Sequence, residues 1–309
     1  MVDVLCLGEP MVELNQDPAA DPPLYRMGFG GDTSNCAIAV MRLGGRAGYW
    51  TRLGCDAFGD ALADLWRREG VAADAVIRDP DAATGAYVVT HGPDGHRFSY
   101  LRAGSAASRM VPADLPRDFA IGLRLLHVSA ISQGISESAC DTVFAAIDQA
   151  KAAGAQVAYD TNLRLQLWPV ARARAIIEAT AAMADVLLPG MDDAKALTGL
   201  DQPDAICDHY LRRGAGVVAL TLGGAGALVA SAAGRVRVAP IAVDVVDATG
   251  AGDTFDGAFL VRFLETGDPV AAGQFANVAA ALSTQGFGAV APIPTRAAVD
   301  ARLASSQTK

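Results

Sequence analysis

The sequence lacks the cysteine and histidine patterns of a metal site or a disulfide framework. Its five cysteines are odd in number and scattered along 309 residues, and no two are spaced as C-x-x-C. Cys6 and Cys36 lie inside apolar runs, which favours buried free thiols. The four histidines show no metal-ligand spacing either. These features indicate a reduced, cytoplasmic setting.

Positive charge and long apolar runs are also scarce. The 25 Lys and Arg residues are outnumbered by 34 Asp and Glu residues, which gives a formal net charge of -9 and a pI near 4.9. A nucleic-acid-binding protein would carry a basic face, so nucleic acid is excluded as a partner. No run approaches the ~20 apolar residues of a membrane span, and residues 1–4 show no basic start of a signal peptide. We therefore expect no membrane partner.

The glycine turn of a dinucleotide-dependent dehydrogenase is missing as well. The first apolar run, residues 4–7, ends at Gly8, which is followed by Glu9, Pro10 and Met11. A G-x-G-x-x-G turn would be expected at that place. This enzyme class is therefore a poor match.

What the sequence does contain is an alternation of short apolar runs with longer Ala-rich stretches of helical spacing. The clearest helical stretch covers residues 138–153 and stops at Gly154. Such alternation predicts a mostly parallel sheet with helices on both faces, whose ligands bind at the carboxyl ends of the strands. The runs predicted as strands are residues 4–7, 125–128, 157–159, 186–188 and 217–220.

Two segments, about 9–31 and 74–103, interrupt this alternation with short strand-like runs. Within the second segment, residues 87–90 and 97–100 flank the turn residues Gly92, Pro93, Asp94 and Gly95, which is typical of a hairpin. We find no internal repeat and no linker. The sequence therefore predicts one domain, 1–309, with a small discontinuous β lid.

The strongest local pattern is the run Asp-Ala-Thr-Gly-Ala-Gly-Asp at residues 247–253, followed by an apolar helical stretch. The small residues Gly250, Ala251 and Gly252 let backbone N–H groups converge at a helix N-terminus, where they form an anion site. Asp253 beside that site can accept a proton from a substrate hydroxyl during phosphoryl transfer. The glycines alone would favour an ordinary glycine turn in which Asp253 is an acid of the first helical turn, but the full run late in an alternating α/β chain favours the anion site.

The same run resembles the C-terminal signature of the PfkB, or ribokinase-like, carbohydrate kinases. Residues 30–35, Gly-Gly-Asp-Thr-Ser-Asn, resemble the N-terminal glycine signature of that family and lead into an apolar helix. Ala248 departs from the pattern, because family members usually carry Thr or another small polar or branched residue there. The resemblance implies a three-layer α/β/α sandwich, ATP and Mg²⁺ as cofactors, and Asp253 as the catalytic base.

Within the family, four segments resemble 2-keto-3-deoxygluconate kinases: residues 8–14, 97–108, 160–164 with Leu167-Trp168 shortly after, and 187–190. That resemblance implies two sets of site residues. The sugar acid would be bound by Gly31, Asp32, Asn35, Tyr87, Tyr100, Arg102 and Arg164. The nucleotide would be flanked by Asn162, Arg164, Thr221, Gly223, Gly224, Gly226 and Asn277.

Arginines near the cleft suit a sugar acid, because a planar guanidinium binds a carboxylate bidentately. Arg102 follows the hairpin and Arg164 follows a strand end, so both are candidates for this clamp. The alternative for Arg102 is a solvated lid arginine. Tyr87 and Tyr100 are equally compatible with cross-strand packing on the hairpin.

Two further assignments depend on the resemblance. The glycine run at 223–226 follows a predicted buried strand, and without the family match it would be an ordinary hairpin turn. Asp193 stands where the family often has the Glu of an Asn-x-x-Glu motif associated with Mg²⁺, while Gly190 replaces the Asn. Asp193 is therefore a candidate for magnesium binding through water, or simply an acid in the first turn of a helix.

The function predicted from these features is ATP-dependent phosphorylation of 2-keto-3-deoxygluconate at its primary hydroxyl. A fructokinase or ribokinase acting on a neutral sugar is the first alternative, since such a substrate needs no arginine clamp. A non-catalytic sugar-binding protein on the same fold is a more distant one. By analogy with the family, a homo-oligomer paired through the lid is expected.

Overall fold

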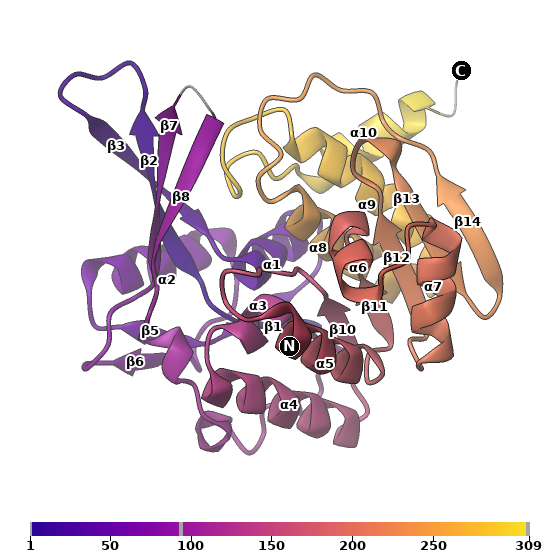
Figure 1. Cartoon of the computed structure of the whole chain (residues 1–309), viewed down its shortest axis with the longest axis horizontal. Helices are drawn as coiled ribbons and strands as arrows, with labels where there is room; N and C mark the ends of the chain where they lie inside the picture. Colours follow the sequence, from indigo (N-terminus) through magenta and orange to yellow (C-terminus); the bar gives the residue numbers. More distant parts are fainter. Residues whose placement is uncertain (1, 93–94, 307–309) are drawn as a thin grey trace.

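The computed structural model describes residues 2–92 and 95–306, and an eight-stranded sheet forms its centre (Figure 1). The strand order is β14-β13-β12-β11-β10-β9-β1-β4. These strands are β1 (Val4–Leu7), β4 (Ala47–Trp50), β9 (Leu125–Ser129), β10 (Gln156–Asp160), β11 (Val186–Leu188), β12 (Val217–Thr221), β13 (Ala227–Ser231) and β14 (Gly234–Val238).

The sheet is parallel from β4 through β1, β9, β10 and β11 to β12. Only β13 and β14 join it antiparallel. All five apolar runs predicted as strands form strands of this sheet. Parallel strands that are buried on both faces read as continuous apolar runs, which is why these segments were recognisable.

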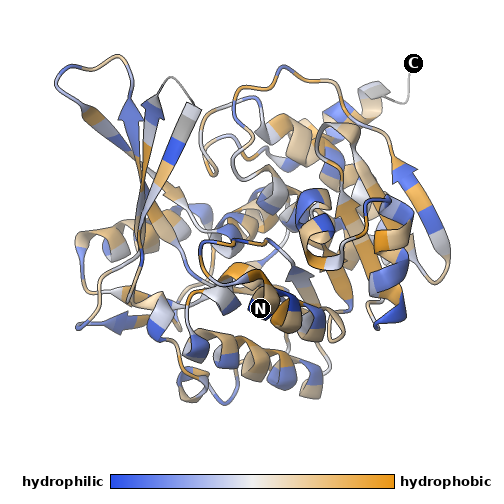
Figure 2. Ribbon diagram, viewed as in Figure 1, coloured by the Kyte–Doolittle hydropathy of each residue, from blue (hydrophilic) through white to orange (hydrophobic). Residues whose placement is uncertain are grey.

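Successive residues of the strands point into two separate cores. Val157 packs in one core, whereas its neighbour Ala158 packs in the other, as expected when side chains alternate across a strand. Figure 2 shows apolar residues concentrated in the central strands. One face is covered by α1 (Asp32–Arg42), α2 (Ala57–Glu69), α8 (Ala251–Thr266), α9 (Pro269–Ser283) and α10 (Arg296–Ser306), and the other by α4 (Glu137–Ala152), α5 (Val170–Ala181), α6 (Met191–Thr198) and α7 (Pro203–Arg212). The predicted three-layer α/β/α architecture is confirmed.

Helix α4 illustrates how local sequence defines these elements. Ser136 caps its start by accepting a hydrogen bond from the N–H of Ala139, so the helix begins one residue before the predicted range. Val143 and Ile147, four residues apart, face the core, and Gly154 follows the end of the helix with a positive φ of 80°. Among the helices of the described part of the chain, none is long and apolar enough to cross a membrane.

A second sheet of four strands projects from the main body (Figure 1). Its order is β3-β2-β7-β8, formed by β2 (Met11–Asp17), β3 (Leu24–Gly30), β7 (Ala86–Gly92) and β8 (Gly95–Leu101). The strands β7 and β8 form the predicted hairpin, although Pro93 and Asp94 of its turn lie outside the described residues. We refer to this sheet as the lid sheet.

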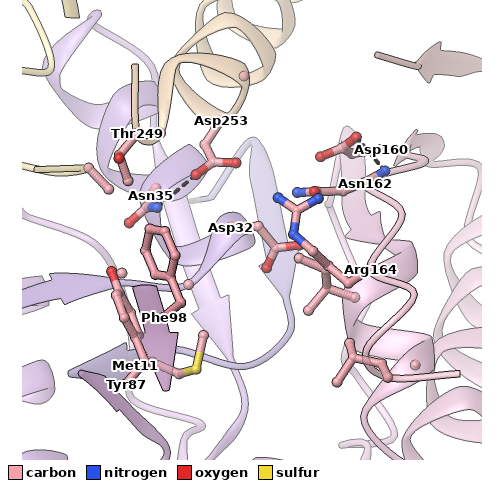
Figure 3. Close-up of a pocket in the computed structure, with 18 of the residues that line it drawn as sticks. Met11, Asp32, Asn35, Tyr87, Phe98, Asp160, Asn162, Arg164, Thr249 and Asp253 are labelled. Atoms are coloured by element: carbon pink, nitrogen blue, oxygen red, sulfur yellow. Dashed lines mark hydrogen bonds between the residues drawn. The ribbon is translucent and has the colours of Figure 1, made fainter. Parts of the chain in front are cut away.

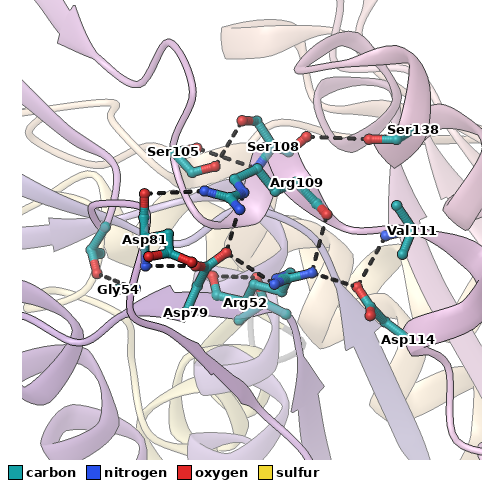
Figure 4. Close-up of polar contacts among 12 residues, drawn as sticks. Arg52, Gly54, Asp79, Asp81, Ser105, Ser108, Arg109, Val111, Asp114 and Ser138 are labelled. Atoms are coloured by element: carbon teal, nitrogen blue, oxygen red, sulfur yellow. Dashed lines mark hydrogen bonds and ion pairs between the residues drawn. The ribbon is translucent and has the colours of Figure 1, made fainter.

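The second segment predicted for the lid, 74–103, joins the lid sheet only from β7 onwards, which begins at Ala86. Strand β6 (Ile77–Asp79) pairs instead with β5 (Arg52–Gly54) in a separate two-stranded sheet. An ionic network fixes this region, in which Asp79 accepts from Arg52 and pairs with Arg109, while Arg52 also binds Asp114 (Figure 4). Asp79 is only 2% exposed, so its two arginines compensate a charge that burial would otherwise make costly. The network joins the chain before the lid hairpin to the chain after it.

Strand β14 forms one outer edge of the central sheet. Its arginines Arg235 and Arg237 are exposed, and Arg235 forms ion pairs with Asp204 and Asp208 of α7. Charged side chains on an edge strand oppose pairing with strands of other molecules.

Candidate active site

A cleft of about 770 Å³ lies where the lid sheet meets the carboxyl ends of the parallel strands. The sheet topology predicts a ligand site at this place. The cleft gathers residues from β10, α1, α6, α8 and the lid sheet. Of the residues predicted from the sequence, it is lined by Gly31, Asp32, Asn35, Tyr87, Tyr100, Arg102, Asn162, Arg164, Asp193, Thr221, Gly250, Gly252 and Asp253.

The remaining predicted residues are not among those that line this cleft. Gly223, Gly224 and Gly226 form the connection between antiparallel β12 and β13, as an ordinary hairpin turn would. Asn277, on α9, donates from Nδ2 to the carbonyl oxygen of Ala239 at 2.8 Å. Ala251 is the first residue of α8 and contributes its backbone to the start of that helix.

The glycine turn at the start of α8 has a conformation that only glycine adopts readily. Gly250 has φ 75° and ψ 5°, and a Cβ there would come within 2.9 Å of Ala289. Gly252 differs, since a Cβ there would meet no atom within 4 Å. Its open side belongs to the cleft, so the backbone at Gly252 is accessible to a ligand.

Asp253 lies in the first turn of α8 and bonds to the other glycine motif. Nδ2 of Asn35, in the first turn of α1, donates to Oδ2 of Asp253 at 2.7 Å (Figure 3). The two motifs are 218 residues apart in sequence. Their meeting at one hydrogen bond places Asn35 as the residue that orients Asp253.

Burial and nearby charge poise Asp253 for proton transfer. Its pKa is raised to about 7, first because the carboxyl is buried and then because Asp32 is close by. The hydrogen bond from Asn35 and the positive charge of Arg164 oppose this rise in pKa. A carboxylate with a pKa near 7 is well matched to a general base at neutral pH.

Two further carboxyl groups, which were not predicted from the sequence, also line the cleft. These are Asp160, at the end of β10, and Asp256, on α8, which lie close enough for Asp160 to raise the pKa of Asp256. The pKa of each is well above its usual range, because burial is reinforced by the neighbouring carboxyl groups. Asp256 could have been found from the sequence, because residues three apart on a helix lie on the same face, and Asp253 had already been selected.

The two candidate arginines are held differently. Figure 3 shows Arg164 pointing into the cleft between Asp32 and Asp160. Burial raises the pKa of both Asp32 and Asp193, and the positive charge of Arg164 opposes that rise. Arg102 is instead 10% exposed and forms an ion pair with buried Glu9. The alternative that Arg102 is a solvated lid arginine is therefore wrong.

The lid sheet contributes an aromatic wall to the cleft. Tyr87 and Tyr100 face each other across β7 and β8 with ring centroids 5.9 Å apart, so they pack across the strands and also line the cleft. The hydroxyl of Tyr87 donates to Oε2 of Glu13 at 2.7 Å. Phe98 stacks on Tyr100 and was missed, although its position two residues before Tyr100 puts both on one face of β8.

Asp193 is placed where it can assist a cation. It lies in the first turn of α6 and lines the cleft, and its Oδ2 accepts from the N–H of Leu163 at 2.9 Å. Within residues 2–92 and 95–306, no cluster of three His, Cys, Asp or Glu side chains could hold a metal alone. Mg²⁺ usually binds one or two carboxylates together with waters and substrate phosphates, so Asp193 in an open cleft fits that ion.

Comparison with known proteins agrees with this geometry. The model of the pfkB family of carbohydrate kinases matches residues 1–296. A 2-dehydro-3-deoxygluconokinase of Bacillus subtilis is 32% identical over 92% of this chain and 89% of its own length. A probable fructokinase of Arabidopsis thaliana is 34% identical over 92% of this chain and 90% of its own.

A solved structure extends the similarity to three dimensions. The fructokinase of Xylella fastidiosa with bound ATP superposes with a TM-score of 0.90 and 25% identity, covering 99% of each chain. The match of the family model to nearly the whole chain agrees with the three-layer fold and with both glycine motifs. The chain therefore belongs to the pfkB family of carbohydrate kinases, and it is a phosphotransferase that uses an alcohol group as its acceptor.

Proposed function

We propose that this sugar kinase transfers the γ-phosphoryl group of ATP to the primary hydroxyl of 2-keto-3-deoxygluconate, which yields the 6-phosphate. The observation that carries the proposal is that Arg102 and Arg164 both line the cleft that holds Asp253. Two guanidinium groups suit a substrate that carries a carboxylate. The similarity to a 2-dehydro-3-deoxygluconokinase supports the same substrate.

In the proposed reaction, Asp253 accepts the proton of the attacking hydroxyl. The backbone N–H groups of Gly250, Ala251 and Gly252, at the positive end of the α8 dipole, stabilise negative charge on the transferred group. Gly31, Asp32, Asn35, Tyr87 and Tyr100 surround the sugar, and the lid sheet covers it.

We propose that the nucleotide lies along the β10 to β12 side of the cleft, where Asn162, Arg164 and Thr221 line it. The turn with Gly223, Gly224 and Gly226 and the side chain of Asn277 do not line the cleft, and we propose that they flank the adenosine beyond it. Bound ATP in the structurally similar fructokinase supports this nucleotide. When bound, Mg²⁺ neutralises charge on the β- and γ-phosphates, and Asp193 is the side chain proposed to hold it through water.

A neutral-sugar kinase is the alternative that a specific observation favours. Arg102 is already paired with Glu9, and Arg164 lies between Asp32 and Asp160, so both arginines have acidic neighbours before a substrate binds. The probable fructokinase relative is as similar as the sugar-acid kinase. A non-catalytic sugar-binding protein fits less well, because the pKa of Asp253 suits a base.

A comparison of kcat/KM for 2-keto-3-deoxygluconate and for fructose, with ATP, tests the substrate. We expect the acid to be preferred by more than about tenfold, since each 1.4 kcal/mol gives that factor and a charge-assisted bond is worth about 1.5–3 kcal/mol. Arg102→Ala should reduce kcat/KM for the acid and leave fructose nearly unchanged. A preference for fructose would make the substrate assignment wrong while the chain remained a sugar kinase.

We also propose that a second copy of the chain covers the lid sheet. Leu24, Met27 and Leu101 are 61%, 53% and 62% exposed on strands β3 and β8. Large exposed apolar side chains on both edge strands of one small sheet are typical of an interface. The molar mass in solution should be that of a dimer, and Met27→Glu should yield monomers. A monomeric wild-type protein at micromolar concentration would rule this out.

The compartment that we propose is the reducing cytoplasm. All five cysteines are free, and four of them are buried. Free thiols persist in compartments where glutathione and thioredoxin keep them reduced.

A further inference from the structure

Glu9 is a fully buried carboxylate at the base of the lid sheet, directly after Gly8 at the end of β1. Oε2 of Glu9 pairs with Nη2 of Arg102, and Oε1 accepts a hydrogen bond from Oγ of Ser105. Both partners follow strand β8. The carboxylate therefore binds the chain as it leaves the lid sheet.

The chain that enters the lid hairpin also lies against Glu9. A Cβ at Gly85, just before β7, would come within 2.8 Å of Oε1 of Glu9. The backbone N–H of Ala106 donates to the carbonyl oxygen of Ala83 at 2.8 Å, which joins the entering and leaving segments. Glu9 is thus packed between the two ends of the hairpin and has little freedom to move.

Arg102 has a second acidic neighbour besides Glu9. Burial raises the pKa of both Glu9 and Asp32, and the positive charge of Arg102 opposes the rise at both, so the guanidinium lies within electrostatic range of both carboxyls. Asp32 lines the cleft, in the motif that also supplies Asn35 to Asp253. A guanidinium drawn onto Asp32 would occupy space proposed for the sugar.

We propose that Glu9 is a positioning residue for substrate selection, which holds the guanidinium of Arg102 at the wall of the cleft and away from Asp32. The inference rests on the proposed function, in which Arg102 binds the carboxylate of a sugar acid. Held in this way, Arg102 keeps its ion pair with Glu9 through Nη2, while neither Nη2 nor Nε has a regular hydrogen-bond partner within the described residues. A buried donor without a partner is costly, and a substrate carboxylate would remove that cost.

Replacement of Glu9 by Gln keeps the size of the side chain and its hydrogen bond to Ser105 but removes the charge. We expect Glu9→Gln to raise KM for 2-keto-3-deoxygluconate by about tenfold or more, since loss of one partner of a buried charge pair misplaces the other. The values of kcat for the acid and of KM for fructose should stay within about twofold, because Arg102 does not contact a neutral sugar in the proposed complex.

A matched control is the Glu69→Gln variant. Glu69 forms a bidentate ion pair with Arg42 between α1 and α2, outside the cleft. Its loss should lower Tm without changing the ratio of KM for the acid to KM for fructose. This comparison separates loss of stability from loss of selection.

A double-mutant cycle tests the mechanism. In the Arg102→Ala background, Glu9→Gln should have no further effect on KM for the acid, because nothing remains to be positioned. An unchanged acid-to-fructose KM ratio in Glu9→Gln, or a full effect in the Arg102→Ala background, would overturn the inference alone. A wild-type enzyme that phosphorylates fructose but not the acid would overturn the proposed substrate, and the inference with it.

Should Glu9→Gln not fold, Ser105→Ala provides the same test in milder form. This variant removes the hydrogen bond to Oε1 of Glu9, together with a longer one of 3.3 Å that Oγ accepts from the N–H of Ser108, and leaves the ion pair in place. The ratio of KM for the acid to KM for fructose should move in the same direction by about two- to threefold, the size expected for loss of one hydrogen bond. A ratio equal to that of wild type would overturn the inference.

Discussion

The two ends of the cleft are held by different kinds of contact. At the end proposed to hold the transferred phosphoryl group, here called the phosphoryl end, Asp253 and its glycine turn begin helix α8, which packs on α1 and α9 within the core. At the end proposed to hold the sugar, here called the sugar end, Tyr87, Tyr100 and Arg102 lie on or just beyond the lid sheet, whose strands β3 and β8 form open edges. The phosphoryl end is therefore fixed by core packing, whereas the sugar end depends on a few polar contacts with Glu9 and Glu13.

This difference indicates how chemistry and selectivity are divided. If the proposed base or anion site is altered, the enzyme should lose activity towards every sugar, because both act on the phosphoryl transfer itself. A sugar end held by separate side-chain contacts can change its substrate while the phosphoryl end stays intact. The experiments below test whether the two ends behave independently.

Replacement of Asp253 should break the phosphoryl end alone. We expect Asp253→Asn to lower kcat by ~10²–10⁴-fold, because no other group would accept the hydroxyl proton. The dissociation constant of the sugar, measured by calorimetry, should change little, since the lid contacts remain. A kcat equal to that of wild type would show that Asp253 is not the base.

Gly252→Ala should produce the next largest effect. A methyl group there meets no protein atom within 4 Å, so the fold and Tm should be preserved. It would project into the cleft beside the anion site and displace the transferring group, with an expected loss of ~10²-fold in kcat/KM.

The matched control is Gly92→Ala in the lid sheet. A methyl group at Gly92 would also have room, since the nearest atom lies 3.9 Å away, and Gly92 does not line the cleft. Its kcat/KM should equal that of wild type. If Gly252→Ala were as active as Gly92→Ala, the transferred phosphoryl group would not bind beside Gly252.

The pH dependence should report the base of the phosphoryl end. With the pKa of Asp253 at about 7, kcat/KM should rise as pH increases towards 7 and level off above it, because only the ionised carboxyl accepts a proton. Asn35→Ala should move this limb to higher pH, since the hydrogen bond from Asn35 lowers the pKa of Asp253. If the pH at which kcat/KM rises were the same in Asn35→Ala and in wild type, the titrating group would not be Asp253.

The smallest expected effect is on stability. The pKa of Asp253 is higher in the folded chain than in the unfolded one, so its contribution to stability is complete below about pH 4 and is lost as pH rises through about 7. At pH 8, Asp253→Asn should therefore raise Tm by about 2–5 °C. Below about pH 4, where the carboxyl is protonated in both the folded and the unfolded chain, this difference in Tm should vanish.

The phosphoryl end could be predicted from local residue chemistry, whereas the sugar end depended on the resemblance to a family, for a physical reason. Gly250 and Asp253 belong to one turn, so local backbone chemistry was sufficient to propose an anion site and a base. The strands were visible because each is buried on both faces. The predicted roles of these residues stay predictions until variants are measured.

Contacts between distant segments had no such local pattern. The ion pair of Glu9 with Arg102 and the hydrogen bond of Asn35 with Asp253 join residues that are far apart in the sequence. No helical or strand periodicity relates such residues, so neither contact could be predicted from the local pattern. The close approach of Asp160 to Asp256 likewise depends on where β10 ends relative to α8. Tertiary packing, rather than propensity, decides such contacts.

The outer strand β14 has a consequence for the protein in concentrated solution. Backbone groups along its free edge could extend the sheet into another molecule, and Val236 on that strand is 40% exposed. Arg235 and Arg237 flank this valine, and charged side chains beside an exposed apolar residue oppose pairing of an edge strand with another strand. The free edge of β14 is therefore protected against extension of the central sheet by a second molecule.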